Sequence, residues 1–164
     1  MSTEPTTLTQ NQIAETDFEK RRGISRVEVR DGFTQVHVTG LPEPIAKSRI
    51  GVLEMVSVAK VSLDFLKLTP TGMSFVIPSE RTSDIQTTFE VAELQFQMVT
   101  DRSIVLVHAV NMRDEEGMVA GIVRRTISAG IAVDHVTDMH DRMLIILPKD
   151  NATKLQQLIE KEVA

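Results

Sequence analysis

The spacing of apolar residues changes along the chain and predicts strands that alternate with helices. Hydrophobic and polar residues alternate over residues 25–31 and 34–40, which is typical of half-buried strands, and Asp31-Gly32 between them predicts a turn. Residues 46–58 instead follow a helical period. The apolar positions of this predicted helix are Ala46, Ile50, Leu53 and Val56.

The remaining pattern completes a unit of four strands and two helices and then begins the same order again. Strands are expected over 61–68 and 73–77, joined by a hairpin turn, and a helix is expected over 79–93. The second half of the chain predicts the same succession of elements. Its strands are expected at 94–100, 104–110, 131–137 and 143–147, and its helices at 117–129 and 152–163.

The two halves overlay at an offset of about 70 residues, and the apolar positions keep their phase. Asp31 falls on Asp101, Ala59 falls on Ala129, and the run 75–78 falls on 145–148. Such a match indicates internal duplication. The chain is therefore divided into a flexible polar tail over 1–22, with a short helix near 13–21, a first unit over 23–93 and a second unit over 94–164.

Each predicted unit reads strand, strand, helix, strand, strand, helix. If one strand is exchanged between the two copies, this order is that of a ferredoxin-like unit. The expected fold class is α+β, with antiparallel sheets that carry two helices on one face.

Composition excludes several classes of partner. The chain has 164 residues, 41% of them hydrophobic, and a net charge of −5, and its longest basic run is Lys20-Arg21-Arg22, so no nucleic-acid partner is expected. No apolar stretch reaches the roughly 20 residues that span a bilayer, so no membrane partner is expected. The chain has no cysteine, which excludes disulfides and zinc–thiolate sites and fits a cytoplasmic location.

Nothing in the sequence supports catalysis or a cofactor. His135 and His140 lie among aspartates, but alternation along a strand sends neighbouring side chains to opposite faces, so we expect no metal site there. No serine lies in a nucleophile elbow, and no glycine-rich phosphate loop is present. The protein is therefore not expected to be an enzyme.

Two segments of the second half carry a resemblance to a known family. They are Asn111-Met-Arg-Asp-Glu-Glu-Gly117-Met-Val-Ala-Gly-Ile-Val and Ala129-Gly-Ile-Ala-Val-Asp-His135, and Gly40-Leu-Pro-Glu-Pro44 matches a loop of the same family. Together with the order of elements they resemble the ACT regulatory domains at the C-terminus of aspartate kinases, over about residues 23–163. The kinase domain itself is not in this sequence.

The resemblance implies that two ACT units pack together, that the chain forms a homodimer, and that an amino acid binds at the ACT interface. In general, the N–H groups at a helix N-terminus can accept a carboxylate, and an acidic side chain can hold an ammonium group. The implied ligand-binding residues of the second copy are Asp114, Gly117, Met118, Ala132, Val133 and Asp134. Those of the first copy are Glu43, Ser62, Leu63 and Asp64.

The second copy is the better candidate for this site. Gly117 permits close approach of a ligand to the backbone, whereas Lys47 occupies the equivalent position in the first copy. We expect the N-terminus of the following helix to bind the carboxylate, and Asp114 or Asp134 to bind the ammonium group. For each acidic residue of these loops, the favoured alternative is a stabilising charge at a helix N-terminus.

Two functions remain open at this point. The first is an amino-acid-binding regulatory module, aspartate-kinase-like, that acts as a sensor or as a regulatory subunit of a metabolic enzyme. The second is a ligand-free dimerisation and protein-interaction module derived from ACT domains. Ser62 and Ala132 stand where the family has an asparagine, and this departure favours the second function.

Overall fold

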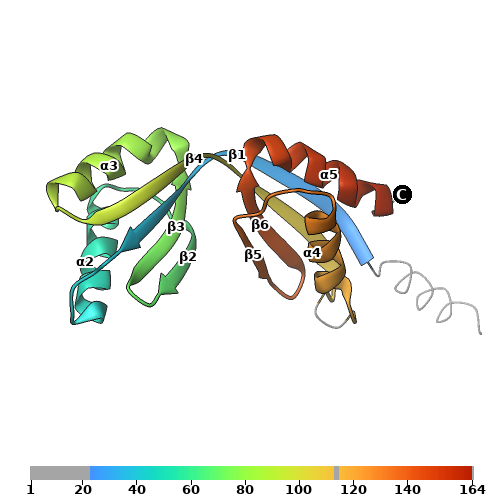
Figure 1. Ribbon diagram of the computed structural model, residues 1–164, viewed down its shortest axis with the longest axis horizontal. Coiled ribbons are helices and arrows are strands. Elements are labelled where there is room, and N and C mark those ends of the chain that lie inside the picture. Colours follow the sequence, from blue (N-terminus) through green and yellow to red (C-terminus); the bar gives the residue numbers. More distant parts are fainter. Residues whose placement is uncertain (1–22, 113–114, 164) are drawn as a thin grey trace, which may run out of the picture. The chain divides into compact units, whose positions relative to one another are not determined.

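A computed structural model describes residues 23–112 and 115–163 (Figure 1). Hydrogen-bonded neighbours among the strands follow the order β2-β3-β1-β4-β6-β5. The elements are β1 (Gly23–Thr39), α2 (Ile45–Val58), β2 (Asp64–Thr69), β3 (Gly72–Pro78), a 3-10 turn (Ser79–Arg81), α3 (Thr82–Val91), β4 (Gln95–Val110), α4 (Met118–Ser128), β5 (His135–Asp138), β6 (Arg142–Pro148) and α5 (Lys149–Val163).

The two longest strands correct the sequence prediction. The turn expected at Asp31-Gly32 does not reverse the chain, because β1 runs unbroken through it, and the strands expected at 94–100 and 104–110 form the single strand β4. Gly32 has φ 85° and Asp101 has φ 54° within these strands. Glycine and aspartate adopt this left-handed conformation at low cost, so the local signal marked a positive φ without ending the strand.

The chain forms two compact units, and each long strand contributes to both. The first-repeat unit holds Arg30–Ile104 with Leu147–Lys149. Among the described residues, the second-repeat unit holds 23–29, 105–112, 115–146 and 150–163. The division expected at residues 93 and 94 follows the sequence repeat, whereas the contacts place the first part of β1 with the second repeat and the first part of β4 with the first.

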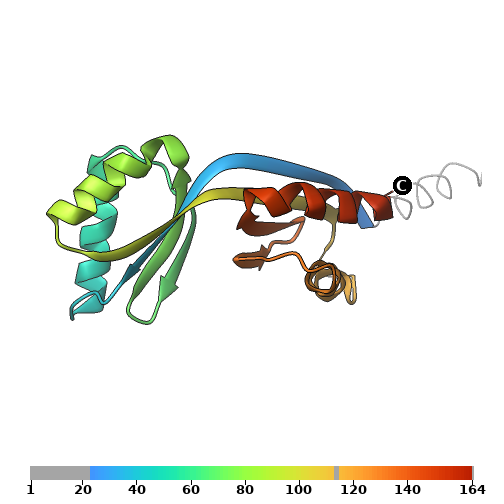
Figure 2. The same cartoon turned by 45° about the horizontal axis from the view of Figure 1, so that its top comes forward.

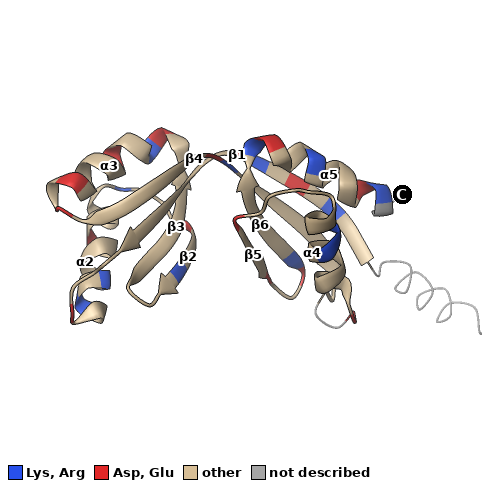
Figure 3. Cartoon of the chain, viewed as in Figure 1, with Lys and Arg blue, Asp and Glu red and all other residues tan. Residues whose placement is uncertain are grey.

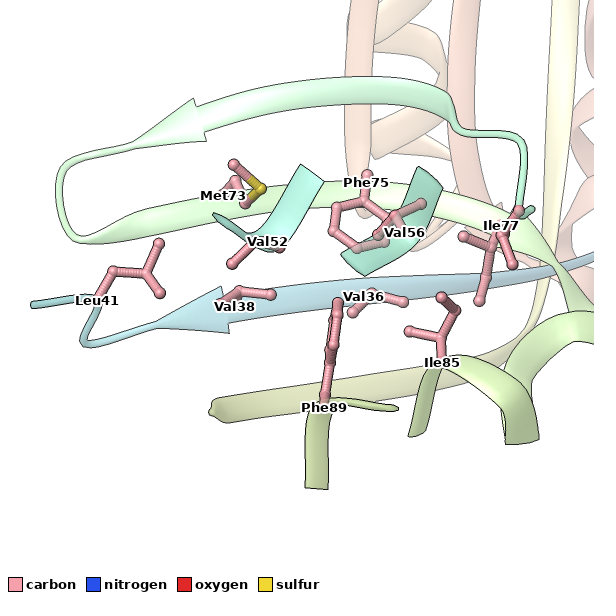
Figure 4. Close-up of a cluster of buried hydrophobic side chains, with 11 residues drawn as sticks. Val36, Val38, Leu41, Val52, Val56, Met73, Phe75, Ile77, Ile85 and Phe89 are labelled. Carbon is pink, nitrogen blue, oxygen red and sulfur yellow. The ribbon is translucent and has the colours of Figure 1, made fainter. Parts of the chain in front are cut away.

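In the first-repeat unit the chain order is strand, helix, strand, strand, helix, strand, which is the ferredoxin-like order. β1 pairs with β3 and β2 pairs with β3, both antiparallel. Helices α2 and α3 lie on one face of these strands (Figure 2). Between helices and strands lies the core cluster drawn in Figure 4, in which the rings of Phe75 and Phe89 meet edge to face at 6.3 Å.

In the second-repeat unit the same order begins with the second part of β4 and continues through α4, β5, β6 and α5. The first part of β1, from Gly23, supplies the remaining strand of this unit, beside β4. β5 pairs antiparallel with β6. The large buried side chains of this unit include Ile122, Met143, Ile145, Leu155 and Ile159.

The shorter strands begin later than the sequence predicted. The strands expected from residues 61 and 131 begin at Asp64 and His135. The tail expected over 1–22, its short helix and Asp114 lie outside the described residues. Among the residues that the structure describes, no helix is long and apolar enough to cross a membrane.

Candidate functional site

The C-terminal turns of α2 and α4 have the same backbone pattern, and both lead into predicted site residues. The N–H of Val61 donates to the carbonyl of Val56 at 3.3 Å, and the N–H of Ile131 donates to that of Thr126 at 3.2 Å. Each bond spans five residues, and not the four of an α-helix, and it closes a left-handed turn that ends the helix, with φ 55° at Lys60 and φ 74° at Gly130. The turns therefore align the two repeats at an offset of 70 residues and delay the strands that follow.

A pocket of about 350 Å³ lies in the second-repeat unit, between the C-terminal half of α4 and strands β5 and β6. The predicted site residues Val133 and Asp134 both line it. Asp134 is held in place by its own backbone, because its N–H donates to the carbonyl of Ile146 at 2.8 Å. The complete lining is Val123, Thr126, Ile127, Ile131, Val133, Asp134, His135, Val136 and Ile145.

The walls of this pocket are mostly aliphatic, and its polar groups are few. The buried hydroxyl of Thr126 donates to the carbonyl of Ile122 at 2.7 Å, which leaves the oxygen able only to accept a further hydrogen bond. Asp134 is exposed to solvent and is the acidic residue of the lining. An apolar cavity with one acidic residue in its lining suits a small cation with an apolar body.

Ala132 lies next to this pocket without lining it. It is exposed, and its carbonyl accepts a hydrogen bond of 3.4 Å from the side-chain amide of Asn151 at the beginning of α5. The contact ties the loop before β5 to the second helix of the same unit. The hydrogen bond at the Ala132 carbonyl therefore connects the loop that carries Val133 and Asp134 to α5.

Gly117 and Met118 lie at the opposite end of α4 from Asp134. Gly117 precedes the helix with φ 78° and ψ 0°, and its carbonyl accepts the N–H of Gly121 at 2.8 Å. The helix has 11 residues, so its two ends are about 16 Å apart at about 1.5 Å per residue. Within this unit, Gly117 and Met118 therefore lie at one end of α4, and the pocket lined by Val133 and Asp134 lies at the other.

The residues predicted in the first repeat are differently engaged. The carboxylate of Glu43 accepts the N–H of Ile45 at 3.0 Å, so it caps the N-terminus of α2. Leu63 packs against the hydrophobic core, whereas Ser62 and Asp64 are exposed beside the beginning of β2. Lys47 is exposed in the first turn of α2. Glu43 thus acts as a favourable charge at a helix N-terminus, which is the alternative to a ligand-binding role for these acidic loop residues.

A second group of polar residues lies on the paired ends of β1 and β4 in the second-repeat unit. Nε2 of His108 lies 3.2 Å from Nη2 of Arg26 and 3.5 Å from the carboxylate of Glu28. The hydroxyl of Ser25 donates to the carbonyl of His108 at 3.1 Å. Both signs of charge occur along α2 and α5, whereas α4 carries only basic residues and α3 only acidic ones (Figure 3). Within 23–112 and 115–163 no three His, Cys, Asp or Glu residues are grouped for a metal ion.

Sequence reasoning missed most of the pocket lining. The sequence placed Val123, Thr126 and Ile127 only within the helix expected at 117–129, and Ile145 only within the strand expected at 143–147. A position-by-position comparison of side-chain size between the repeats is the signal that would have found them, because a pocket in one copy requires smaller residues than the other copy has there.

No protein-family model and no curated protein matches the sequence. Solved structures do match over most of the chain. The ligand-free regulatory subunit of aspartate kinase from Thermus thermophilus is 16% identical with a TM-score of 0.74, and the match covers 85% of this chain and 97% of that one. The regulatory subunit from Thermus flavus is 14% identical with a TM-score of 0.75, over 87% of this chain and 100% of that one.

A longer enzyme contains the same fold as part of its chain. Aspartokinase III of E. coli, solved in complex with lysine and aspartate, is 10% identical with a TM-score of 0.66. The match covers 85% of this chain and 33% of that one. The present chain therefore has the fold of the regulatory subunits of aspartate kinase, without a kinase domain in this sequence.

Proposed function

We propose that this protein is a regulatory module that binds an amino acid in its second repeat and controls a metabolic enzyme through that binding. The observation that carries the proposal is the pocket beside α4. Two residues that the sequence assigned to a ligand site, Val133 and Asp134, line a cavity of about 350 Å³. Cavities of this size are at the lower end of the range for small-molecule sites, about 300–1,000 Å³.

The chemistry of the pocket supports an amino acid as the ligand. The carboxylate of Asp134 is a partner for an ammonium group, and the aliphatic walls are a partner for a side chain. The fold supports a regulatory role, since it is shared with regulatory subunits of aspartate kinase. A ligand regulates such a module when it binds one conformation or assembly more tightly than another.

The N-terminal end of α4 is the other candidate for the same ligand. Its support is the resemblance together with the open space around Gly117, where an added Cβ would meet nothing within 4 Å. Replacement by asparagine, which tolerates a positive φ, tests this end. Loss of binding in Gly117→Asn with intact binding in Asp134→Asn would move the site to the N-terminus of α4.

The direct test is a thermal-shift screen of the twenty amino acids and common nucleotides against the whole chain. A ligand at 100 times its dissociation constant adds about 2.7 kcal/mol of stability if only the native state binds it. We expect at least one amino acid to raise the unfolding temperature in a concentration-dependent manner. If none does, the ligand-free dimerisation module is the better account.

A further inference from the structure

The pocket of the second repeat lies where the first repeat has larger side chains. With the repeats aligned at 70 residues, five of the nine wall positions carry a smaller side chain in the second copy. In the first repeat these positions are Leu53, Leu63, Phe65, Leu66 and Phe75, and in the second they are Val123, Val133, His135, Val136 and Ile145. Each exchange removes apolar volume from the wall of the pocket.

In the first repeat the larger side chains fill the corresponding space. Leu53 and Leu63 pack against the core cluster, and Phe75 is completely buried against the ring of Phe89. The turns at the C-terminal ends of α2 and α4 have the same backbone hydrogen bonds. The second repeat therefore has the same backbone arrangement here, with smaller side chains inside it. The missing volume is therefore that of aliphatic and aromatic carbon.

Two other exchanges determine the shape of the cavity. Ile131 replaces Val61 and returns one methylene to the wall. Ile127 replaces Ser57, and although it is 66% exposed it lines the pocket. An exposed isoleucine where the other repeat has a serine extends the apolar wall toward solvent, which favours an apolar group that enters from outside.

We propose that this pocket takes the aliphatic side chain of a branched amino acid such as valine, leucine or isoleucine, one molecule per chain. The proposal rests on the proposed function, because it names the ligand class of the same site. A charged side chain would lose its hydration among these walls, and burial of an unpaired charge is costly. The carboxylate of the solvent-exposed Asp134 binds the ligand's ammonium group instead.

Titration calorimetry on the whole chain tests the ligand class with L-leucine, L-isoleucine and L-valine against L-alanine, L-serine, L-aspartate and L-lysine. Loss of one methylene from a ligand in a fitted apolar pocket costs about ten-fold or more in affinity. The aliphatic amino acids should therefore bind at least ten-fold more tightly than the other four, with one site per chain.

Residues of the first repeat supply the filling variants. Val133→Leu and Val123→Leu should each weaken leucine binding at least ten-fold, while the unfolding temperature of the free protein stays at or above that of the wild type. The matched exchange in the other unit, Leu53→Val, should leave the affinity unchanged. If Val133→Leu lowers the unfolding temperature, the leucine affinity of Val123→Leu, a substitution in helix α4, decides the test.

The outcomes separate the two proposals. If lysine, aspartate or serine binds as tightly as leucine, or if both filling variants that fold bind leucine normally, the aliphatic ligand class is wrong and the amino-acid-binding function stands. If no amino acid binds the wild type, both proposals fail.

Discussion

The hydroxyl of Ser103 donates a hydrogen bond of 2.5 Å to the carboxylate of Asp31, although 72 residues separate them in the sequence. Ser103 is completely buried, whereas Asp31 is exposed. The bond joins β1 and β4 within the first-repeat unit, next to the positive φ values of Gly32 and Asp101. The side chains thus connect the two long strands where their backbones depart from regular extended geometry.

Removal of this hydroxyl should destabilise the protein. Because hydrogen bonds to charged groups contribute about 1.5–3 kcal/mol and Asp31 can still bind water, we expect Ser103→Ala to lower the free energy of unfolding by about 1.5 kcal/mol. Urea denaturation measures this change. Ser25→Ala removes an exposed hydroxyl bond and should stay within about 0.5 kcal/mol of the wild type. Equal effects of the two substitutions would show that the Asp31 bond has no special weight.

Two glycine-to-alanine substitutions should have opposite effects. A Cβ on Gly72 would overlap the carbonyl oxygen of Val38, and neither backbone segment can move without disturbing the pairing of β1 with β3. We expect Gly72→Ala to cost more than about 3 kcal/mol or to prevent folding. Gly51 lies inside α2 with open space at its Cβ, so Gly51→Ala should stabilise by about 0.5–1 kcal/mol. Thermal unfolding of both variants checks the pair.

The contact between Asp141 and Arg142 should be measurable as a lowered pKa of the Asp141 carboxyl. Nε of Arg142 donates to the Asp141 carboxylate at 3.0 Å and, with its positive charge, holds the pKa of that carboxyl below its ordinary value. A lowered pKa means that the stabilisation is present above the ordinary pKa of aspartate and is lost as the pH falls through the lowered value. In Arg142→Ala an NMR titration of Asp141 should show its pKa raised toward normal; an unchanged pKa would contradict this cause.

The edge of the first-repeat unit supports a homodimer. β2 ends the strand order, and its Leu66 and Leu68 are 45% and 57% exposed on an edge that can pair with another chain. We expect a dimer at micromolar concentration by light scattering, and a monomer for the double variant Leu66→Lys with Leu68→Lys. Val58→Lys, on the exposed end of α2, should remain dimeric. A monomeric wild type would refute the dimer.

The role of Asp134 gives a further prediction. The variant Asp134→Asn keeps the shape of the side chain and removes its charge, so amino-acid affinity should fall at least ten-fold, given about 1.5–3 kcal/mol for a charge-assisted bond. Calorimetry measures it. Glu160→Gln removes one charge from α5 of the same unit, away from the pocket lining, and controls for the change in net charge. Equal affinity in both variants would exclude Asp134 as the ammonium partner.

The helices could be predicted from the sequence because their signal is local and repeated. α2 was expected at 46–58 and spans Ile45–Val58. The long strands could not be predicted in this way, since Asp31-Gly32 has the composition of a turn. The continuation of β1 depends on pairing with strands that are distant in the sequence, such as β3 over Phe33–Val38. The site prediction also lacked information on distances in space. Family resemblance placed Gly117 and Asp134 in one site, and in this unit they lie at opposite ends of α4.

The pocket was outside the reach of periodicity for another reason. Val123 and Ile145 satisfy the apolar pattern as well as Leu53 and Phe75 do. A pattern of hydrophobic and polar positions therefore does not show that the side chains of the second repeat are smaller. Packed protein interiors contain few voids, so a loss of side-chain volume at these positions indicates a pocket once the backbone arrangement is known.

Amide hydrogen exchange, with and without a saturating concentration of the amino acid that the screen identifies, tests the central claim most directly. Binding at the pocket predicts slower exchange for the segment 123–136, which covers the end of α4 and β5, and unchanged exchange for the equivalent segment 53–66 of the first repeat. Protection confined to 53–66, or equal protection of both segments, would contradict a ligand site in the second repeat.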